Sequence, residues 1–385
     1  MKTNVKFDIK SFERAKKIAR LKSEALKLPS KNKLSADIPE EIGIQLTYRC
    51  NLRCGHCYQW NESGFFNSYN KSKINNELDI DILRRVLDET KPVKSNLYLW
   101  GGEPMIYKHW DQFCKMLEHD PRWTVVCTNG LLIQPKLDSI LSISENLALL
   151  ISLDGFETEH DTIRGKGTFS KIIENIRLLL SLKRQNIFKG SVSVYCVLSD
   201  LMIPKMYEFM KFFESLNVDT VYFGFPWYIS PNLASEMDSY YKMKFSWLKS
   251  EVENPSWHSY TFHLSNEVVN ELKLQIALLE SQRWNVRIRI QPSLKVAELE
   301  DFISGNSKTA MNRSQCLGLA NRIDILADGS AGPCKFFPEF SVGNLNEESL
   351  MEIWQGEKYN KIRKEIKCGL MPICSKCVIL YLNGV

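Results

Sequence analysis

The chain of 385 residues lacks any long hydrophobic run and any strong excess of charge of one sign. No stretch reaches the roughly 20 apolar residues that a membrane span requires, and the N-terminus has no apolar signal-peptide core. The 50 basic and 45 acidic residues are spread along the sequence, so the formal net charge of +5 gives little reason to expect nucleic-acid binding. Internal repeats and low-complexity segments are also missing. We therefore expect a cytoplasmic globular protein with neither a membrane nor a nucleic-acid partner.

Cysteine, in contrast, is abundant. The sequence has eleven cysteines, three of them near residue 50 and five in the last seventy residues. In a cytosolic chain of this size, such clusters indicate metal ligands rather than disulfide bonds. Cys114, Cys127 and Cys196 stand alone in predicted helices or strands, and we expect them to be small buried hydrophobic side chains without a chemical role.

Short β-branched and aromatic runs alternate with stretches of helical periodicity. The predicted strands are Ile42–Tyr48, Asn96–Trp100, Trp123–Cys127, Leu147–Leu153, Ser191–Leu198 and Thr220–Phe225. The predicted helices between them are Asp79–Thr90, Lys108–Glu118, Phe169–Leu182 and Pro204–Leu216. This βα alternation predicts an α/β fold with a parallel sheet, and six units suit a curved, partial (β/α)6 barrel of TIM type.

Changes of pattern divide the chain into three parts. Residues 1–40 form an N-terminal extension with a helix from Ser11 to about Leu28, residues 41–290 form the barrel, and residues 291–385 form a small α+β domain. The boundary near residue 290 is marked only by a change of pattern after an aromatic-rich connection.

Short motifs rich in cysteine, glycine and polar residues follow four of the predicted strands. They are the first cysteine cluster after Tyr48, Gly101-Gly102-Glu103-Pro104, Thr128-Asn129-Gly130 and Asp154-Gly155. Because the carboxyl ends of parallel strands meet on one face of a barrel, these four motifs predict an active site on that face.

The first cysteine cluster has the spacing Cys50-x3-Cys54-x2-Cys57. Three thiolates select iron-sulfur clusters or zinc, and they leave one metal position open to another ligand. Three interpretations are open: a [4Fe-4S] cluster with one free iron, a zinc site completed by His56, or a coincidence of buried cysteines. The zinc site would require His56 to fold back between the two ligands that flank it.

The three cysteines followed by Tyr58 resemble the signature of radical S-adenosylmethionine (SAM) enzymes. The resemblance implies that the free iron binds the amino and carboxylate groups of SAM. It further implies that an electron from the cluster cleaves SAM to a 5'-deoxyadenosyl radical, which the protein positions and shields.

The other motifs resemble the SAM-contacting segments of the same family. The GGEP resemblance implies that glycines approach SAM closely and that a carboxylate meets its ammonium group. Arg164, in a segment that resembles H-D-x-x-R-G, has the planar fork that suits the SAM carboxylate. The residues that the resemblance assigns to SAM binding are Tyr58, Gly101, Gly102, Glu103, Pro104, Thr128, Asn129, Ser152, Asp154 and Arg164.

The second cysteine cluster contains Cys316, Cys334, Cys368, Cys374 and Cys377. Between the first two of these, an Asp328-Gly329 pair predicts a tight hairpin that brings them together. A helix from Ser349 to Ile366 is expected before the last pair.

This arrangement resembles the SPASM/twitch extension of radical SAM enzymes. Two fully cysteine-ligated clusters would need eight ligands, and five are present. The resemblance therefore implies one auxiliary [4Fe-4S] cluster held by Cys316, Cys334, Cys374 and Cys377, with Cys368 as a spare or fifth candidate. A zinc ribbon made of the same four thiolates is the structural alternative.

The family resemblance also suggests the reaction. Many SPASM/twitch enzymes modify peptides, so we expect oxidative modification or crosslinking of a ribosomally made peptide or protein. An external electron donor of the flavodoxin or ferredoxin type is implied. Forty N-terminal residues leave no room for a leader-recognition domain, which argues against a peptide. The alternatives are a dehydrogenase or other tailoring enzyme for a small molecule such as an aminosugar, and a non-catalytic iron-sulfur protein.

Overall fold

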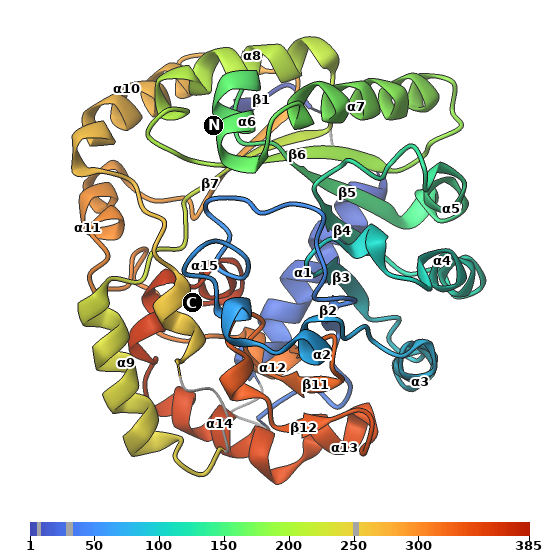
Figure 1. Ribbon diagram of the computed structural model, residues 1–385, viewed down its shortest axis with the longest axis vertical. Helices are drawn as coiled ribbons and strands as arrows, with labels where there is room; N and C mark the ends of the chain where they lie inside the picture. The colour runs from blue at the N-terminus through green and yellow to red at the C-terminus, as the bar shows by residue number, and fades with distance from the viewer. Residues whose placement is uncertain (6–8, 28–33, 249–253) are drawn as a thin grey trace.

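The computed structural model describes residues 1–385 except 6–8, 28–33 and 249–253. Its centre is a ten-stranded sheet in the order β12-β11-β10-β2-β3-β4-β5-β6-β7-β9. The eight neighbouring strands from β10 to β9 in this order are all parallel. The strands are β2 Glu41–Gln45, β3 Asn96–Trp100, β4 Thr124–Thr128, β5 Leu147–Ser152, β6 Ser191–Val197, β7 Thr220–Gly224, β9 Arg287–Gln291, β10 Arg322–Ile325, β11 Ser330–Gly332 and β12 Gly343–Asn344. The curved sheet with helices outside it confirms the predicted α/β fold with a partial barrel (Figure 1).

The helices that follow the strands lie along the outer side of the sheet (Figure 1). They are α3 Ile80–Glu89, α4 Trp110–His119, α5 Leu137–Ser142, α6 Glu157–Arg164, α7 Thr168–Arg184 and α8 Met206–Leu216. In α3 the side chain of Asp79 accepts the N–H of Asp81 and caps the helix, and Ile82, Leu83 and Val86 are buried on one face. Amphipathic faces of this kind cover the apolar side of the sheet.

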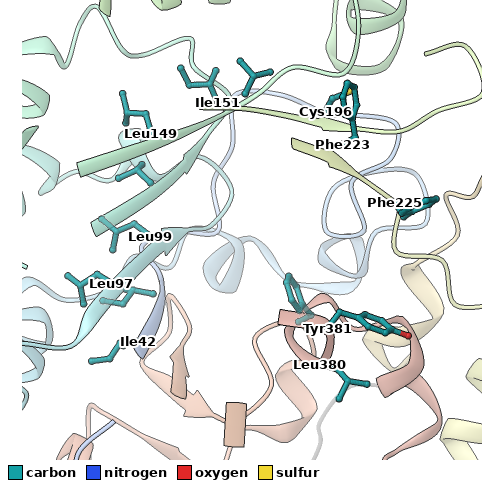
Figure 2. Close-up of a cluster of buried hydrophobic side chains, with 14 of the residues drawn as sticks. Ile42, Leu97, Leu99, Leu149, Ile151, Cys196, Phe223, Phe225, Leu380 and Tyr381 are labelled. Atoms are coloured by element: carbon teal, nitrogen blue, oxygen red, sulfur yellow. The ribbon is translucent and has the colours of Figure 1, made fainter. Parts of the chain in front are cut away.

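Buried strand residues form the core beneath these helices. Figure 2 shows Leu97 and Leu99 of β3 and, on the far side of β4, Leu149 and Ile151 of β5, and none of the four exceeds 1% exposure. Cys196 of β6 is fully buried in the same core, as predicted for an isolated cysteine. In the part of the chain described, we find no helix with the length and hydropathy needed to cross a bilayer.

The N-terminal helix α1, Ile9–Lys27, lies at the amino ends of the strands. Lys17 donates to the side chain of Asn96, the first residue of β3, at 3.3 Å. The predicted end of this helix at Leu28 lies outside the described residues. A short parallel pair, β1 Lys2–Thr3 and β8 Arg283–Trp284, stands apart from the main sheet.

The C-terminal part continues the same sheet. β10 pairs in parallel with β2, and the hairpin predicted at Asp328-Gly329 joins β10 to β11. The expected boundary near residue 290 falls in β9, which pairs with β7. The division of the chain at that point stays a prediction.

The other α-helices are α2 Lys71–Ile74, α9 Pro231–Lys244, α10 Val269–Glu280, α11 Leu299–Ile303, α12 Gly318–Asn321, α13 Leu350–Gln355, α14 Glu357–Cys368 and α15 Val378–Asn383.

The single helix predicted from Ser349 to Ile366 is wrong. Gly356 has an extended conformation with φ −62° and ψ 158°, and it separates α13 from α14. Glycine is a poor helix former, so the amphipathic pattern on either side does not carry one helix through it.

Candidate active site

A cavity of about 680 Å³ lies on the inner side of the curved sheet. Because successive strand residues point to opposite faces, one set of side chains faces the cavity and the other set faces the outer helices. In β4, Val125 and Cys127 line the cavity, whereas Val126 is fully buried and does not. In β6, Tyr195 lines the cavity on the same principle. These inward-facing side chains form one wall of the cavity.

The first cysteine set lies on the loop after β2. Cys50, Cys54 and Cys57 all line the cavity. Burial raises the pKa of Cys50 to about 12 and that of Cys54 to about 11, and the thiols raise one another's pKa further. The N–H of Gly55 donates to the Ile163 carbonyl at 2.9 Å and anchors the loop to α6. Three soft sulfur donors facing a cavity fit a cluster that keeps one iron open to a ligand.

Arg164 reaches from the end of α6 to this loop. Its Nε donates to Asp154 Oδ2 at 2.5 Å, and its Nη1 lies 3.8 Å from Cys54 Sγ. Asp154 also accepts the N–H of Val197 at 2.9 Å. Burial alone would raise the pKa of Asp154, but Arg164 and His56 hold it well below its ordinary value. Arg164 lines the cavity and Asp154 does not, so the aspartate positions an arginine that is available to a ligand.

His56 belongs to this ion-pair network rather than to the thiol set. Its Nε2 lies 2.7 Å from Asp154 Oδ2 and 3.5 Å from Arg164 Nη2. Its ring also lines the cavity. The zinc site with His56 as the fourth ligand is therefore not supported by the geometry.

Gly101 and Gly102 bring the end of β3 against the loop after β2. A Cβ on Gly102 would stand 1.9 Å from the Arg49 carbonyl oxygen, and one on Gly101 would stand 2.6 Å from that of Thr47. The N–H of Gly102 donates to Thr47 at 3.0 Å. Both glycines line the cavity. The close contact that requires glycine at these positions, however, is with the backbone of the loop after β2 and not with a ligand.

Glu103 links two of the predicted motifs. Its carboxylate is 1% exposed and accepts the Thr128 hydroxyl and the Asn129 N–H, each at 2.8 Å. Burial raises the pKa of Glu103, and these donors oppose that rise. Thr128 and Asn129 line the cavity, whereas Glu103 and Pro104 do not. The predicted contact of Glu103 with the SAM ammonium group stays a prediction, because the carboxylate is engaged in joining the two motifs.

Tyr58 and Ser152 also line the cavity. The Tyr58 ring stacks on Tyr260 with centroids 4.5 Å apart and on Trp227 at 6.3 Å. These stacks fix the loop of the first cysteine set against the segment that follows β7.

The second cysteine set gathers in the C-terminal part. Cys316, Cys334, Cys374 and Cys377 are buried enough that the pKa of each is raised, and the thiols of the other three raise the pKa of Cys334 further. Cys368 is exposed at the end of α14. Within the described residues, no three Cys, His, Asp or Glu side chains are spaced as ligands of one metal ion. The effect of the other three thiols on Cys334 places the four near one another, which suits a cluster in which each thiolate binds a different iron.

The sequence-based interpretation missed several cavity residues. Cys127, predicted to be buried without a role, is only half-buried and lines the cavity. The period-two pattern of β4 and its position just before Thr128 were the signal. Lys335, which follows Cys334, also lines the cavity, and burial lowers its pKa to about 7. Its sequence context gave no such signal.

Two family models match the chain. The model of the radical SAM superfamily matches residues 44–213, and that of the SPASM iron-sulfur cluster-binding domain matches residues 316–378. Among curated relatives, the AdoMet-dependent heme synthase of Methanosarcina barkeri is 26% identical over 351 residues, which cover 88% of this chain and 91% of the relative. The subtilosin biosynthesis protein AlbA of Bacillus subtilis is 21% identical, covering 90% and 69%.

Solved structures show the same fold. Streptococcus suis SuiB bound to the precursor peptide SuiA matches with a TM-score of 0.59 at 14% identity, covering 97% of this chain and 78% of that one. The structure of anSMEcpe with bound AdoMet matches with a TM-score of 0.56 at 19% identity, covering 90% and 85%. The chain belongs to the radical SAM superfamily, and it is a radical SAM enzyme with a C-terminal SPASM domain whose cofactors are SAM, a [4Fe-4S] cluster and an auxiliary cluster.

Proposed function

We propose that this enzyme oxidatively modifies or crosslinks a ribosomally made peptide or protein, one side chain of which enters the cavity. The observation that carries the proposal is that the cavity lined by the first cysteine set also reaches the immediate sequence neighbours of two cysteines of the second set. Its wall includes Cys50, Cys54 and Cys57, and it also includes Lys335 beside Cys334 and Val378 beside Cys377. A substrate held there would lie between the two sets, where an oxidation can pass an electron onward.

Each of the two clusters has a set of cysteines that could hold it. Cys50, Cys54 and Cys57 would hold the SAM-binding cluster, and Cys316, Cys334, Cys374 and Cys377 would hold the auxiliary one. When bound, the first cluster and SAM supply a 5'-deoxyadenosyl radical that removes a hydrogen atom. The match of residues 316–378 to an iron-sulfur cluster-binding domain favours iron and sulfide over the zinc-ribbon alternative.

The chain itself supplies binding, orientation and exclusion of water. Arg164 would bind the SAM carboxylate, held in place by Asp154. Thr128, Asn129 and Ser152 would offer polar contacts from neighbouring strand ends. The rings of Trp227 and Phe336 line the other side of the cavity, where they would keep water from a reactive intermediate.

The size of the cavity favours a side chain over a large planar substrate. About 680 Å³ is within the range of roughly 300–1,000 Å³ for a single drug-sized ligand, and SAM must share this space with the reacting group. One amino-acid side chain fits such a remainder. The names of AlbA and of mycofactocin maturase MftC from Mycolicibacterium smegmatis, 28% identical over 163 residues that cover 41% of this chain and 38% of the relative, point the same way.

The second candidate is a small-molecule tailoring enzyme, such as an aminosugar dehydrogenase. It is favoured by the heme synthase relative, which matches 88% of this chain and whose name describes small-molecule chemistry. A flavodoxin or ferredoxin electron donor and a cytoplasmic location remain predictions in either case.

The test uses anaerobically reconstituted enzyme with SAM and dithionite. One arm contains peptides translated from the short reading frames that adjoin the gene, and a second arm contains UDP-N-acetylglucosamine. We expect 5'-deoxyadenosine in both, and a peptide that has lost two hydrogen atoms by mass spectrometry in the first. An unchanged peptide together with an oxidised sugar nucleotide would favour the second candidate.

A further inference from the structure

Lys335 is a buried lysine that follows Cys334 in the sequence and lines the wall of the cavity. The residue is 8% exposed, and its Nζ lies 4.0 Å from the ring centroid of Tyr98. The rings of Trp100 and Phe336 are each 4.6 Å from the same atom. In the described part of the chain, the ammonium group contacts these rings but forms no salt bridge and no hydrogen bond. Because Lys335 also lines the large cavity, a ligand that enters the cavity can supply the missing acceptor.

The other cations of the wall already have partners. Arg164 is paired with Asp154 at 2.5 Å. Arg322 donates to both oxygens of Asp324, at 2.9 and 2.7 Å. The charged or titratable groups that face Lys335 include Arg322, Asp324, Cys127, Cys377 and Tyr98, and both oxygens of the one carboxylate among them accept from Arg322.

A buried water does not account for Lys335. A void of about 10 Å³ borders Lys335, Trp100 and Gln45, and it is close to the roughly 10–15 Å³ that one water needs. The Trp100 Nε1 and Gln45 Nε2 donors have no partner among the described residues, and one water there can accept from both. Lys335 has three N–H donors and borders the large cavity as well, so donors remain for a larger ligand.

We propose that Lys335 binds a carboxylate of the substrate, an acidic side chain or a chain end, and holds the adjoining part of the substrate in the cavity. The fold has already removed the ammonium from bulk water, so an entering carboxylate forms a charge-assisted pair in surroundings of low polarity. Arg322 also lines the cavity, but its guanidinium group is paired with both oxygens of Asp324. The identification of the carboxylate as part of a peptide rests on the proposed function, whereas the recognition of a carboxylate does not.

The test compares two probes of the same shape, phenylacetate and phenylacetamide. Each is titrated calorimetrically into the anaerobically reconstituted, SAM-bound enzyme. Because a hydrogen bond to a charged group is worth about tenfold to a hundredfold in affinity, we expect the acid to bind more tightly than the amide by at least about tenfold.

Three variants identify the lysine. Lys335→Met should reduce the preference for the acid to less than about twofold, and Lys335→Arg should retain it. Lys376→Met is the matched control, because Lys376 is also buried beside an auxiliary cysteine but donates to the Phe302 carbonyl at 3.0 Å and does not line the cavity. This control should keep the preference.

Several results would overturn the proposal. Equal or absent binding of the two probes by the wild-type enzyme, or a preference that survives Lys335→Met, removes the carboxylate site. Loss of SAM affinity in Lys335→Met would assign the lysine to SAM instead. An altered midpoint potential of the auxiliary cluster by electron paramagnetic resonance, with the acid preference intact, would make Lys335 a counter-ion of that cluster. Failure of the peptide to react would overturn the proposed function and leave the probe preference unchanged.

Discussion

The Nε atom of Arg164 and the Oδ2 atom of Asp154 are 2.5 Å apart in an ion pair whose side chains are 9% and 0% exposed. The pair joins the end of α6 to the segment after β5, and it turns the remaining guanidinium nitrogens toward Cys54 and the cavity. The ion pair therefore fixes the position of Arg164 before an anionic ligand binds.

Asp154→Asn should therefore weaken SAM binding by on the order of tenfold and lower the thermal midpoint. Removing one partner of a buried pair costs about 3–5 kcal/mol, since the other charge stays buried. Asp219→Asn is the control, because the Asp219–Lys183 pair has the same 2.5 Å separation but side chains 26% and 33% exposed, for which about 0–1 kcal/mol is expected. Equal SAM affinity in Asp154→Asn and wild type, measured by equilibrium dialysis, would contradict the role of Asp154.

Iron counting distinguishes the cysteines. We expect about eight irons per reconstituted wild-type chain, and about four in Cys374→Ala or in Cys54→Ala, because each variant loses one ligand of one cluster. Cys368→Ala should match the wild type, since this cysteine is exposed and apart from the other four. A wild-type count near four would remove the auxiliary cluster, and a loss of iron in Cys368→Ala would make that residue a ligand.

Gly102→Ala should destabilise the enzyme, because its Cβ would stand 1.9 Å from the Arg49 carbonyl oxygen. Backbone must move to relieve this clash, and overpacking of this kind costs about 1–3 kcal/mol or more. Gly55→Ala is the matched variant in the cysteine loop, where the nearest atom to the new Cβ, the Ile163 carbonyl oxygen, is 3.9 Å away. Thermal midpoints should fall for the first variant and stay near wild type for the second; a similar fall in both would show that the loop tolerates no side chain.

His160 gives the stability a pH dependence. Burial, with the positive charge of Arg164, lowers the pKa of His160 from 6.5 to about 4. Between these values the unfolded chain binds a proton that the folded chain does not, so stability falls as pH drops from about 6.5 to about 4, by about 3 kcal/mol in full. Above pH 6.5 this contribution is constant.

The variant His160→Gln cannot titrate in this range. Its thermal midpoint should fall less steeply than that of the wild type between about pH 6.5 and 5, so the two curves converge on the acid side. The glutamine oxygen can replace His160 Nδ1 as the acceptor of the Asp154 N–H, a bond of 3.1 Å. Parallel curves would show that His160 does not contribute.

Local pattern was enough for the six predicted strands and for four of the helices between them, but it missed α5 and α6. The predicted strand Asn96–Trp100 coincides with β3, because a short β-branched and aromatic run between polar turns has one favourable structure. The same method failed at Gly356, where the helical periodicity continues through a residue whose backbone is extended. It also failed at Cys127, because exposure to an internal cavity depends on the curvature of the whole sheet.

The sequence by itself determined the chemistry available to this protein: three closely spaced thiols, five further cysteines near the end of the chain, and polar motifs placed after strands. Those features follow from residue type and spacing alone. Only the tertiary structure decided that the cavity of the first cysteine set reaches Lys335 and Val378, that Glu103 joins two motifs inside the protein, and that Lys335 has no hydrogen-bond or ion-pair partner among the described residues. Each of these depends on contacts between segments far apart in the chain, which no local pattern encodes.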